Sequence, residues 1–439
     1  MSQYTMTSAP DYIPVKMLRE IQNERFMDTF RYVYANVQWY RDLLEEHNVS
    51  PDSIKSIADI SKLPFVKKTD LRDTYPFGMF AAPRNEIVRY HASSGTTGKP
   101  IVMGYTRGDL EVWNASVARG LAACGINDTD VLQNAYGYGL FTGGLGLHGG
   151  GEKLGCSVVP ISGGNTERQL MLMRDFGATV ISCTPSYFLH LIDHAKKIGF
   201  DWKETKMRAG FFGAEPWTEE MRRSIEAETG IKAYDIYGLT EISGPGVGCE
   251  CACQAGVHIF EDNFYPEIVD TETLEPLPDG EIGELVFTTL CKRGTPLIRY
   301  RTRDITSIVV EQCACGRTIR RISRISHRSD DMMIIRGVNV FPGQIEASLL
   351  AVDPTLIHYQ IVLSKNATGL DVIETRVELS AEKFAELADN VAAVDAFKRA
   401  VGEKMQRTIG INVKITFVEP NSLPRSEGKL NRVVDNRKK

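Results

Sequence analysis

The chain has 439 residues, of which 43% are hydrophobic and 24% are charged, which allows two or more domains and is typical of a folded protein rather than a disordered one. Its formal net charge of -5 at pH 7 and its pI near 6.0 exclude a general attraction to nucleic acid or to an anionic membrane. The first 14 residues lack the basic and then apolar pattern of a secretory signal, so we expect the protein to stay in the cytoplasm.

Helical patterns begin the chain. Residues 15–38 have helical periodicity, and Pro51 and Pro64 interrupt later helical patterns. We therefore expect residues 1–80 to form a helical cap. From about residue 85 to residue 290, short apolar runs alternate with helical segments, which predicts layered α/β structure. The runs and segments are residues 158–160, 167–176, 179–181 and 218–228.

The stretch from residue 131 to residue 151 contains no Asp, Glu, Lys or Arg and has the length of a membrane span. Eight glycines, together with Gln133, Asn134 and His148, make it a poor apolar helix. We predict a loop and the start of a helix that line a pocket.

The later part of the chain is richer in strand patterns. Residues 284–289 and 305–310 are expected to be strands, and the character of the sequence changes after Asp330 and Asp331. We predict an N-terminal α/β domain over residues 1–330, with a β-rich subregion, and a small α+β domain over residues 331–439. The expected elements of this second domain are strands at 359–362, 374–379 and 413–417 and one long helix over 381–409.

A loop rich in hydroxyl groups and glycine is the first candidate for chemistry. Residues 93–100 have the sequence Ser-Ser-Gly-Thr-Thr-Gly-Lys-Pro, in which glycines allow close approach of the backbone and Lys99 adds positive charge, as phosphate requires. Gly95 and Gly98 enclose two residues and Pro100 follows the lysine, so the loop is not a Walker A motif. A P-loop kinase or GTPase is therefore disfavoured.

Four further motifs follow in order. They are Tyr-Gly-Leu-Thr-Glu at 237–241, Tyr-Arg-Thr-Arg-Asp at 300–304, Ile-Ile-Arg-Gly-Val-Asn-Val-Phe-Pro at 334–342 and Pro-Arg-Ser-Glu-Gly-Lys at 424–429. With the loop at 93–100, this ordered set resembles the adenylate-forming superfamily of acyl-CoA synthetases and ligases, and within it the phenylacetate-CoA ligases. The resemblance covers nearly the whole length. It implies a large adenylation domain, a small mobile C-terminal lid domain, and ATP, Mg²⁺ and coenzyme A as the molecules that the enzyme uses.

The resemblance also assigns roles to particular residues. Thr240 and Glu241 would contact the α-phosphate and magnesium, Asp304 the ribose hydroxyls, and Lys429 would bridge the carboxylate and the α-phosphate. The C-terminal domain would rotate about a hinge at Asp330 between adenylation and thioester formation. The expected nucleotide-binding residues are Ser93, Ser94, Gly95, Thr96, Thr97, Gly98, Lys99, Gly213, Ala214, Glu215, Pro216, Asp235, Tyr237, Gly238, Thr240, Asp304 and Arg328.

Residues 134–144 alternate aromatic side chains with glycines, a pattern that can form a flat apolar slot. By resemblance, Tyr136 and Phe141 line the acyl pocket, with Gly143 and Ala214 leaving room for a flat ring. An aromatic acid such as phenylacetate fits this expectation. An aromatic-rich turn in the core is the alternative interpretation.

Nine cysteines in a chain without an export pattern are expected to be thiols or metal ligands. Cys251, His258, Cys313 and Cys315 form the set we prefer for a structural, tetrahedral zinc ion, with Cys249 or Cys253 as substitutes for Cys251. This hypothesis depends on spacing, and free cysteines in loops are its alternative.

Taken singly, each motif has an ordinary structural interpretation, such as a surface loop, a buried aromatic before a turn, a surface ion pair at Asp304 or a solvated Lys429. Their order favours ATP-dependent ligation of an aryl acid to coenzyme A through an acyl-adenylate. The alternatives are nucleotidyl transfer of the coenzyme F390 synthetase type and an inactive nucleotide-binding relative. A homodimer is expected from the family alone.

Overall fold

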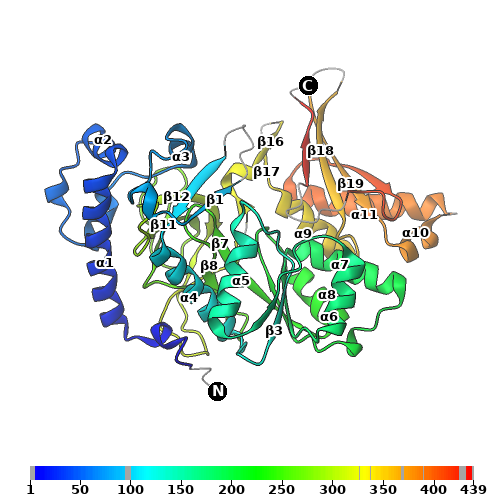
Figure 1. Cartoon of the computed structure of the whole chain (residues 1–439). Helices are drawn as coiled ribbons and strands as arrows, with labels where there is room; N and C mark the ends of the chain where they lie inside the picture. Colours follow the sequence, from blue (N-terminus) through cyan, green and yellow to red (C-terminus); the bar gives the residue numbers. More distant parts are fainter. Residues whose placement is uncertain are drawn as a thin grey trace. The chain divides into compact units, whose positions relative to one another are not determined.

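The computed structural model describes residues 5–93, 100–325, 327–336, 338–366, 370–388, 390–424 and 432–437 (Figure 1). The chain divides into two compact units. The first unit contains residues 1–184, 194–214 and 231–325, and the second contains residues 185–193, 215–230 and 326–439. The second unit therefore includes three stretches that the sequence analysis placed in the N-terminal domain, residues 185–193, 215–230 and 326–330.

The described α-helices begin with a group near the N-terminus and continue between the strands. Their bounds are α1 (Val15–Asn36), α2 (Gln38–Glu46), α3 (Lys68–Asp73), α4 (Arg107–Ala123), α5 (Thr142–Leu154), α6 (Thr166–Asp175), α7 (Pro185–Ile198), α8 (Glu219–Thr229), α9 (Pro342–Val352), α10 (Ala381–Leu387) and α11 (Val391–Ile409). Short 3₁₀ helices lie at Ala9–Tyr12, Pro51–Ser53, Ile57–Lys62, Arg84–Glu86, Trp202–Glu204 and Ser329–Asp331.

The largest sheet of the first unit has the strand order β13-β14-β9-β8-β7-β6-β5-β3-β4. Strands β4, β3, β5, β6 and β7 run parallel, whereas each of the remaining pairs is antiparallel. Their bounds are β3 (Val131–Asn134), β4 (Ser157–Val159), β5 (Val180–Cys183), β6 (Ala209–Phe212), β7 (Lys232–Leu239), β8 (Gly244–Cys249), β9 (Val257–Ile259), β13 (Ile308–Val309) and β14 (Arg321–Ile322).

Two further sets of antiparallel strands complete the first unit. Strand β1 pairs with β2, and β10, β11 and β12 pair in that order. Their bounds are β1 (Arg89–Ser93), β2 (Ile101–Tyr105), β10 (Phe264–Val269), β11 (Gly283–Thr289) and β12 (Tyr300–Thr306). The expected strand over residues 305–310 is therefore wrong in one respect, because the chain leaves β12 at Thr306 and enters another sheet as β13.

Glycines in α5 allow it to pack closely on α4 (Figure 1). A Cβ atom added at Gly150 would lie 2.1 Å from the Val117 side chain, and one at Gly146 would lie 2.5 Å from the Trp113 ring. The uncharged stretch at 131–151 consists of β3, a loop and α5. Gly146, Gly149 and Gly150 of this stretch lie against α4, and no helix within the described ranges is both long and apolar enough to cross a bilayer.

The second unit contains a four-stranded sheet of order β20-β19-β18-β21, a β16–β17 hairpin and a core to which α9 and α11 contribute Ile345, Leu349 and Val401. The expected helix over residues 381–409 is two helices, because the side chain of Asn390 accepts the amide of Ala393 and starts α11 anew. The remaining bounds are β15 (His327–Arg328), β16 (Met333–Ile335), β17 (Val338–Val340), β18 (Tyr359–Lys365), β19 (Asp371–Glu378), β20 (Lys414–Val418) and β21 (Val433–Asp435).

Candidate active site

The predicted site residues of the first unit gather at one edge of the largest sheet. Strands β3, β6 and β7 belong to its parallel part, so their carboxyl ends lie at the same edge. These ends lead to the loop at 135–141, to Gly213 and Ala214, and to the turn at 240–243. Ligands of open α/β sheets bind at such an edge, and β7 is also the strand at which parallel pairing gives way to antiparallel pairing.

Tyr237 and Asp304 are brought together from β7 and β12. The hydroxyl of Tyr237 donates a hydrogen bond of 2.6 Å to Oδ2 of Asp304, and the Tyr237 ring lies 6.1 Å from that of Phe287. The main-chain amide of Asp304 donates to the Thr302 hydroxyl. A short hydrogen bond to a carboxylate fixes its position. Asp304, which is expected to bind the ribose, is therefore held beside Tyr237, which is expected to lie at the adenine.

The arginines next to Asp304 have carboxylate partners of their own. Arg301 pairs with Glu284 at 2.6 Å, and Arg299 pairs with Glu267 at 3.1 Å. All four of these side chains are buried. Arg301 of the motif and the preceding Arg299 therefore contribute buried ion pairs to the β10–β11–β12 sheet that carries Asp304.

Hydroxyl groups surround the turn that follows β7. Glu241, only 4% exposed, accepts a hydrogen bond of 3.2 Å from the Ser93 hydroxyl, and its carboxylate lies 3.4 Å from the Lys68 ammonium. The hydroxyls of Thr240 and Thr142 are 3.2 Å apart. The buried carboxylate of Glu241 and the Ser93 hydroxyl that contacts it are oxygen ligands of the kind that a hard cation prefers.

Gly213 and Gly238 occupy positions where a side chain cannot fit. A Cβ atom at Gly213 would lie 2.3 Å from the carbonyl oxygen of Ile236, and one at Gly238 would lie 1.8 Å from that of Gly244. Ala214 has a φ of 69°, in the left-handed region that disfavours residues with a side chain. The chain thus turns sharply after β6, at the place where we expected the adenine.

Asp235 and Glu215 have structural partners. The amide of Asp235 donates to the Glu250 carboxylate at 2.8 Å, and its carbonyl accepts the Glu250 amide. Within the second unit, Glu215 accepts the amide of Ser186 at 2.8 Å. Pro216 and Arg328 also belong to that unit.

The loop expected to form the acyl pocket is held by Asn134. Its side-chain amide donates to the carbonyl of Gly144 and to the hydroxyl of Tyr138, both at 2.7 Å. Tyr136 is buried, and a Cβ atom at Gly143 would lie 3.3 Å from its ring. Phe141 is 57% exposed at the start of α5. Tyr136 and Gly143 therefore pack together, whereas Phe141 projects from the loop into solvent.

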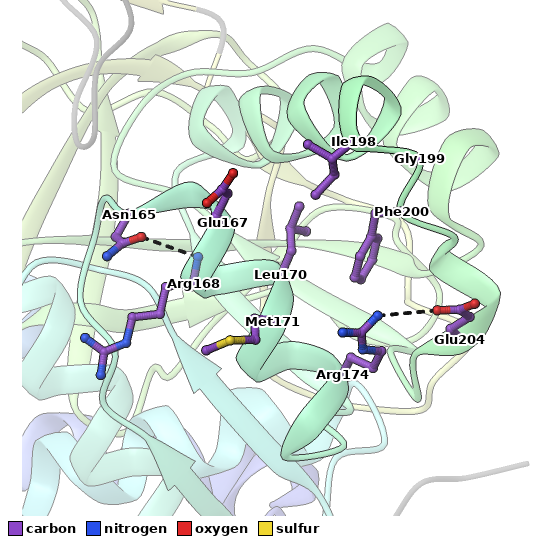
Figure 2. Close-up of a pocket in the computed structure, with 10 residues that line it drawn as sticks. All are labelled: Asn165, Glu167, Arg168, Leu170, Met171, Arg174, Ile198, Gly199, Phe200 and Glu204. Carbon is purple, nitrogen blue, oxygen red and sulfur yellow. Dashed lines mark hydrogen bonds and ion pairs between the residues drawn. The ribbon is translucent and has the colours of Figure 1, made fainter.

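A groove of about 530 Å³ lies on α6 and on the segment after α7 (Figure 2). Figure 2 shows Arg174 paired with Glu204, and the side chain of Asn165 accepting the amide of Arg168. The residues that line it include none that we predicted for the nucleotide or the acid. We do not assign it a part in the chemistry below.

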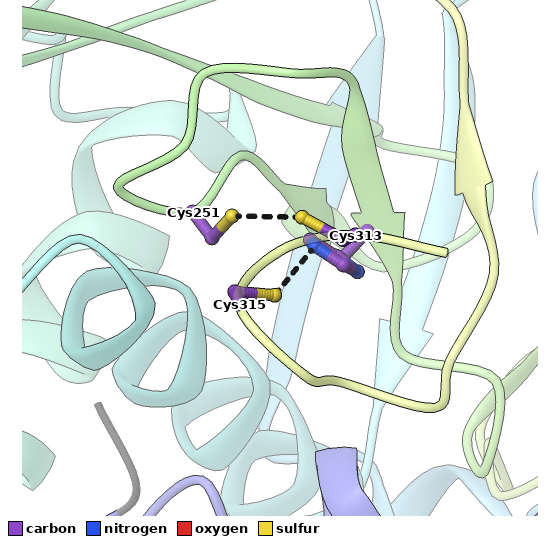
Figure 3. Close-up of side chains that lie close together, drawn as sticks. Cys251, Cys313 and Cys315 are labelled. Atoms are coloured by element: carbon purple, nitrogen blue, oxygen red, sulfur yellow. Dashed lines mark hydrogen bonds between the residues drawn. The ribbon is translucent and has the colours of Figure 1, made fainter. Parts of the chain in front are cut away.

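Cys251, His258, Cys313 and Cys315 converge in the first unit. One ligand atom from each lies within 4.8 Å of the others. The Cys251 and Cys313 sulfurs are 3.7 Å apart, and the Cys315 sulfur is 3.4 Å from Nε2 of His258. Figure 3 shows the three thiols facing one another. Cys253 is exposed, so Cys251 is the member of its loop that reaches the cluster.

Comparison with known proteins identifies the family. The family model described as AMP-binding enzyme matches residues 81–291, and that of the AMP-binding enzyme C-terminal domain matches residues 337–437. The chain is 51% identical to a phenylacetate-coenzyme A ligase of Thermus thermophilus, covering 97% of this chain and 98% of that protein. It is 47% identical to the enzyme of the same name from Escherichia coli, with 96% and 95% covered.

The chain belongs to the phenylacetate-coenzyme A ligase family. Members are AMP-forming acid–thiol ligases that use ATP and coenzyme A, which confirms the predicted enzyme class and favours it over nucleotidyl transfer. The fold is also confirmed. A structure of 2-hydroxyisobutyryl-CoA ligase with R3-HIB-AMP, in the postadenylation state, matches with a TM-score of 0.90 at 27% identity, covering 98% of this chain and 92% of that one.

Several residues expected from the ligase family fall outside the described part of the chain. These are the loop residues Ser94 to Lys99 and the lysine of the C-terminal motif, Lys429. The hinge candidate Asp330 lies at a short 3₁₀ helix, Ser329–Asp331, and its side chain is likewise outside the description. Their roles stay predictions.

Sequence reasoning missed two lysines of the first unit. Lys68, at the start of α3, approaches Glu241, and Lys292, just after β11, is bonded to the turn that carries it. Neither lysine belongs to one of the motifs used above. Their proximity to Glu241 depends on tertiary structure, so sequence order gives no sign of it.

Proposed function

We propose that this ligase activates phenylacetate or a close aryl analogue with ATP and transfers the acyl group to coenzyme A, releasing AMP and pyrophosphate. The observation that supports this most strongly is the identity of 47–51% with curated phenylacetate-coenzyme A ligases over nearly the full length. The buried ring of Tyr136 against Gly143 provides the apolar surface that an aryl acid needs.

In the proposed adenylation step the carboxylate of the acid attacks the α-phosphate, and pyrophosphate leaves. Asp304 accepts hydrogen bonds from the ribose hydroxyls, and its position is set by Tyr237, whose ring lies beside the adenine. The loop from Ser93 to Lys99 covers the β- and γ-phosphates, and Lys429 bridges the carboxylate and the α-phosphate. Positioning and electrostatic stabilisation dominate such a reaction.

Glu241 is proposed to hold magnesium. Its buried carboxylate, with the Ser93 hydroxyl 3.2 Å away, offers the oxygen ligands that this hard cation prefers. When bound, magnesium neutralises charge on the phosphates. The Lys68 ammonium, 3.4 Å from Glu241, supplies a positive charge beside the same carboxylate.

Thioester formation is proposed to follow after the C-terminal domain rotates about Asp330, which withdraws Lys429 and admits the thiol of coenzyme A. Rotation about a few boundary residues is a common way to reuse one site. We also propose a homodimer, and size-exclusion chromatography with light scattering tests its mass.

The cysteine and histidine cluster is proposed to bind a structural zinc ion. Zinc held tetrahedrally at about 2.3 Å from sulfur and about 2.0 Å from nitrogen would separate two sulfurs by about 3.8 Å and sulfur from nitrogen by about 3.5 Å. The distances of 3.7 Å between Cys251 and Cys313 and 3.4 Å between Cys315 and His258 agree. The neighbouring thiol of Cys251 and the His258 imidazole lower the pKa of Cys315, whereas the Cys315 thiol and burial raise the pKa of Cys251, so zinc binding would release a proton from Cys251.

The test of the proposed substrate is a competition among acids. Phenylacetate, benzoate, indoleacetate, 2-hydroxyisobutyrate and acetate are each supplied with ATP, magnesium and coenzyme A, and kcat/KM for the thioester is measured. Phenylacetate or a ring-substituted phenylacetate should give the highest value. If a small aliphatic acid gives the highest value, the aryl assignment is wrong while the ligase class stands.

A further inference from the structure

The turn at residues 240–243 presents four consecutive main-chain carbonyls to two buried side chains. The Tyr105 hydroxyl lies 3.2 Å from the carbonyl oxygen of Thr240 and 3.1 Å from that of Ser243. The hydroxyl has one proton, which these two acceptors share. The outer carbonyls of the turn are thus tied to a residue at the end of β2, more than a hundred residues earlier in the chain.

The two inner carbonyls are tied to Lys292. Its ammonium nitrogen lies 2.8 Å from the carbonyl oxygen of Ile242 and 3.3 Å from that of Glu241. An amine carries at least two protons in either protonation state, so both bonds can form whether or not the lysine is charged. Every carbonyl from residue 240 to residue 243 therefore has a side-chain donor.

The two donors also contact each other. The Lys292 nitrogen lies 4.4 Å from the centre of the Tyr105 ring, within the range of a cation–π contact, and the same ring stacks on Trp113 with 5.2 Å between the ring centroids. Tyr105 is fully buried and Lys292 is 6% exposed. Burial of a lysine is costly in free energy. The hydrogen bonds that offset this cost are those to the carbonyls of Glu241 and Ile242, in the turn that also carries Thr240.

We propose that Tyr105 and Lys292 are positioning residues for adenylation, a role that rests on the proposed function. Their hydrogen bonds hold the main-chain carbonyls of residues 240–243 in place, so that the Thr240 hydroxyl and the Glu241 carboxylate face the phosphates and the cation. Without these hydrogen bonds the turn could rotate. Even a small displacement of the catalytic groups lowers the reaction rate strongly. We call these two side chains the carbonyl clamp.

The experiment uses Tyr105→Phe, which removes one oxygen atom, and Lys292→Met, which keeps an unbranched side chain of all but the terminal atom and removes its donors. Tyr40→Phe is the matched control, because Tyr40 is buried and its hydroxyl bonds to main-chain atoms of Pro296 and Ile298, away from the turn. Thermal unfolding of each variant is measured alongside wild type.

Measuring the two half-reactions separately distinguishes a positioning role of these side chains from a general effect on protein stability. Adenylation is followed as pyrophosphate release from ATP, and thioester formation is followed from chemically prepared phenylacetyl-adenylate and coenzyme A without ATP. Tyr105→Phe should slow adenylation about 10-fold and Lys292→Met about 100-fold. Both should slow thioester formation less than adenylation, because Glu241 serves the cation that accompanies ATP, whereas the contact of Thr240 with the α-phosphate persists in the adenylate. Tyr40→Phe should change neither half-reaction.

A binding measurement provides a readout that does not depend on turnover. Titration calorimetry with a non-hydrolysable ATP analogue, with and without magnesium, should show that magnesium strengthens binding to wild type more than to the clamp variants. Equal slowing of both half-reactions, or a full magnesium effect in the variants, would overturn the proposal. If Lys292→Met fails to fold, Tyr105→Phe alone decides. Failure of wild type to adenylate any acid would instead contradict the proposed function.

Discussion

Replacement of Cys251 by serine tests the zinc assignment, and the chain contains its own control two residues away. Cys251 is fully buried with its sulfur in the cluster, whereas Cys253 is exposed in the same loop. Serine has nearly the shape of cysteine but is a poor zinc ligand. Cys251→Ser should therefore release the metal, and Cys253→Ser should retain it.

The expected loss of stability follows from the length of the chain segment that the zinc ion would cross-link. Cys251 and Cys313 are 62 residues apart, and a cross-link over that span stabilises the folded chain by about 4 kcal/mol in the chain-entropy estimate. Gly316, with a φ of 80°, forms the turn after Cys315 that returns the chain to β14. For a unit of this size, 4 kcal/mol corresponds to a fall in Tm of about 4 to 8 °C.

The assay combines metal analysis with thermal unfolding. Wild type and Cys253→Ser should contain about one zinc ion per chain, the stoichiometry of a closed four-ligand site, and should lose stability when a strong chelator is added. Cys251→Ser should contain little zinc and should not respond to the chelator. The reasoning is refuted if purified wild type binds no zinc when supplied with it, or if the two serine variants lose equal stability.

Three further predictions concern the proposed nucleotide site. Asp304→Asn should raise the KM for ATP about 10- to 100-fold, since hydrogen bonds to a charged group are lost, and the variant should discriminate less than wild type between ATP and 2′-deoxy-ATP in steady-state kinetics; an unchanged KM would remove Asp304 from the ribose. Glu241→Gln should slow pyrophosphate release roughly 100-fold and raise the magnesium concentration needed for half-maximal rate, and a normal magnesium titration would count against its role. Lys429→Ala should slow adenylation by roughly 100-fold or more while preformed phenylacetyl-adenylate still yields thioester; equal loss in both steps would contradict a role confined to adenylation.

The order of motifs predicted the family and the fold class, and one of these motifs, Tyr-Gly-Leu-Thr-Glu at 237–241, lies where the parallel strand β7 ends. Tyr237 lies near the end of β7 and Gly213 directly follows β6, so the fold brings to one sheet edge two residues that the sequence analysis assigned to the nucleotide by family resemblance. The cysteine spacing also selected a set of four residues that the fold brings within 4.8 Å. The spacing alone does not decide between Cys251 and Cys253 as the ligand, because it does not determine which side chain of the loop points into the protein.

Features that depend on tertiary pairing were not predictable. The sequence around Ile305 to Val310 has one continuous strand pattern, yet β12 pairs with β11 and β13 pairs with β14, so partner choice divides it. The long helical pattern after residue 381 is divided by a capping asparagine, Asn390. Lys292 stands in a Lys-Arg pair of the sequence, and its burial depends on the packing of Tyr105 at the end of β2 and of the turn at 240–243 around it.

The measurement that tests the central claim most directly is product stoichiometry in one reaction of purified enzyme, ATP, magnesium, phenylacetate and coenzyme A. AMP, pyrophosphate and phenylacetyl-CoA are quantified together by chromatography, with and without the thiol. The proposed function predicts equal amounts of all three products, with sustained turnover only when coenzyme A is present. Continuous pyrophosphate release without thioester, or release of ADP and phosphate in place of AMP, would contradict it.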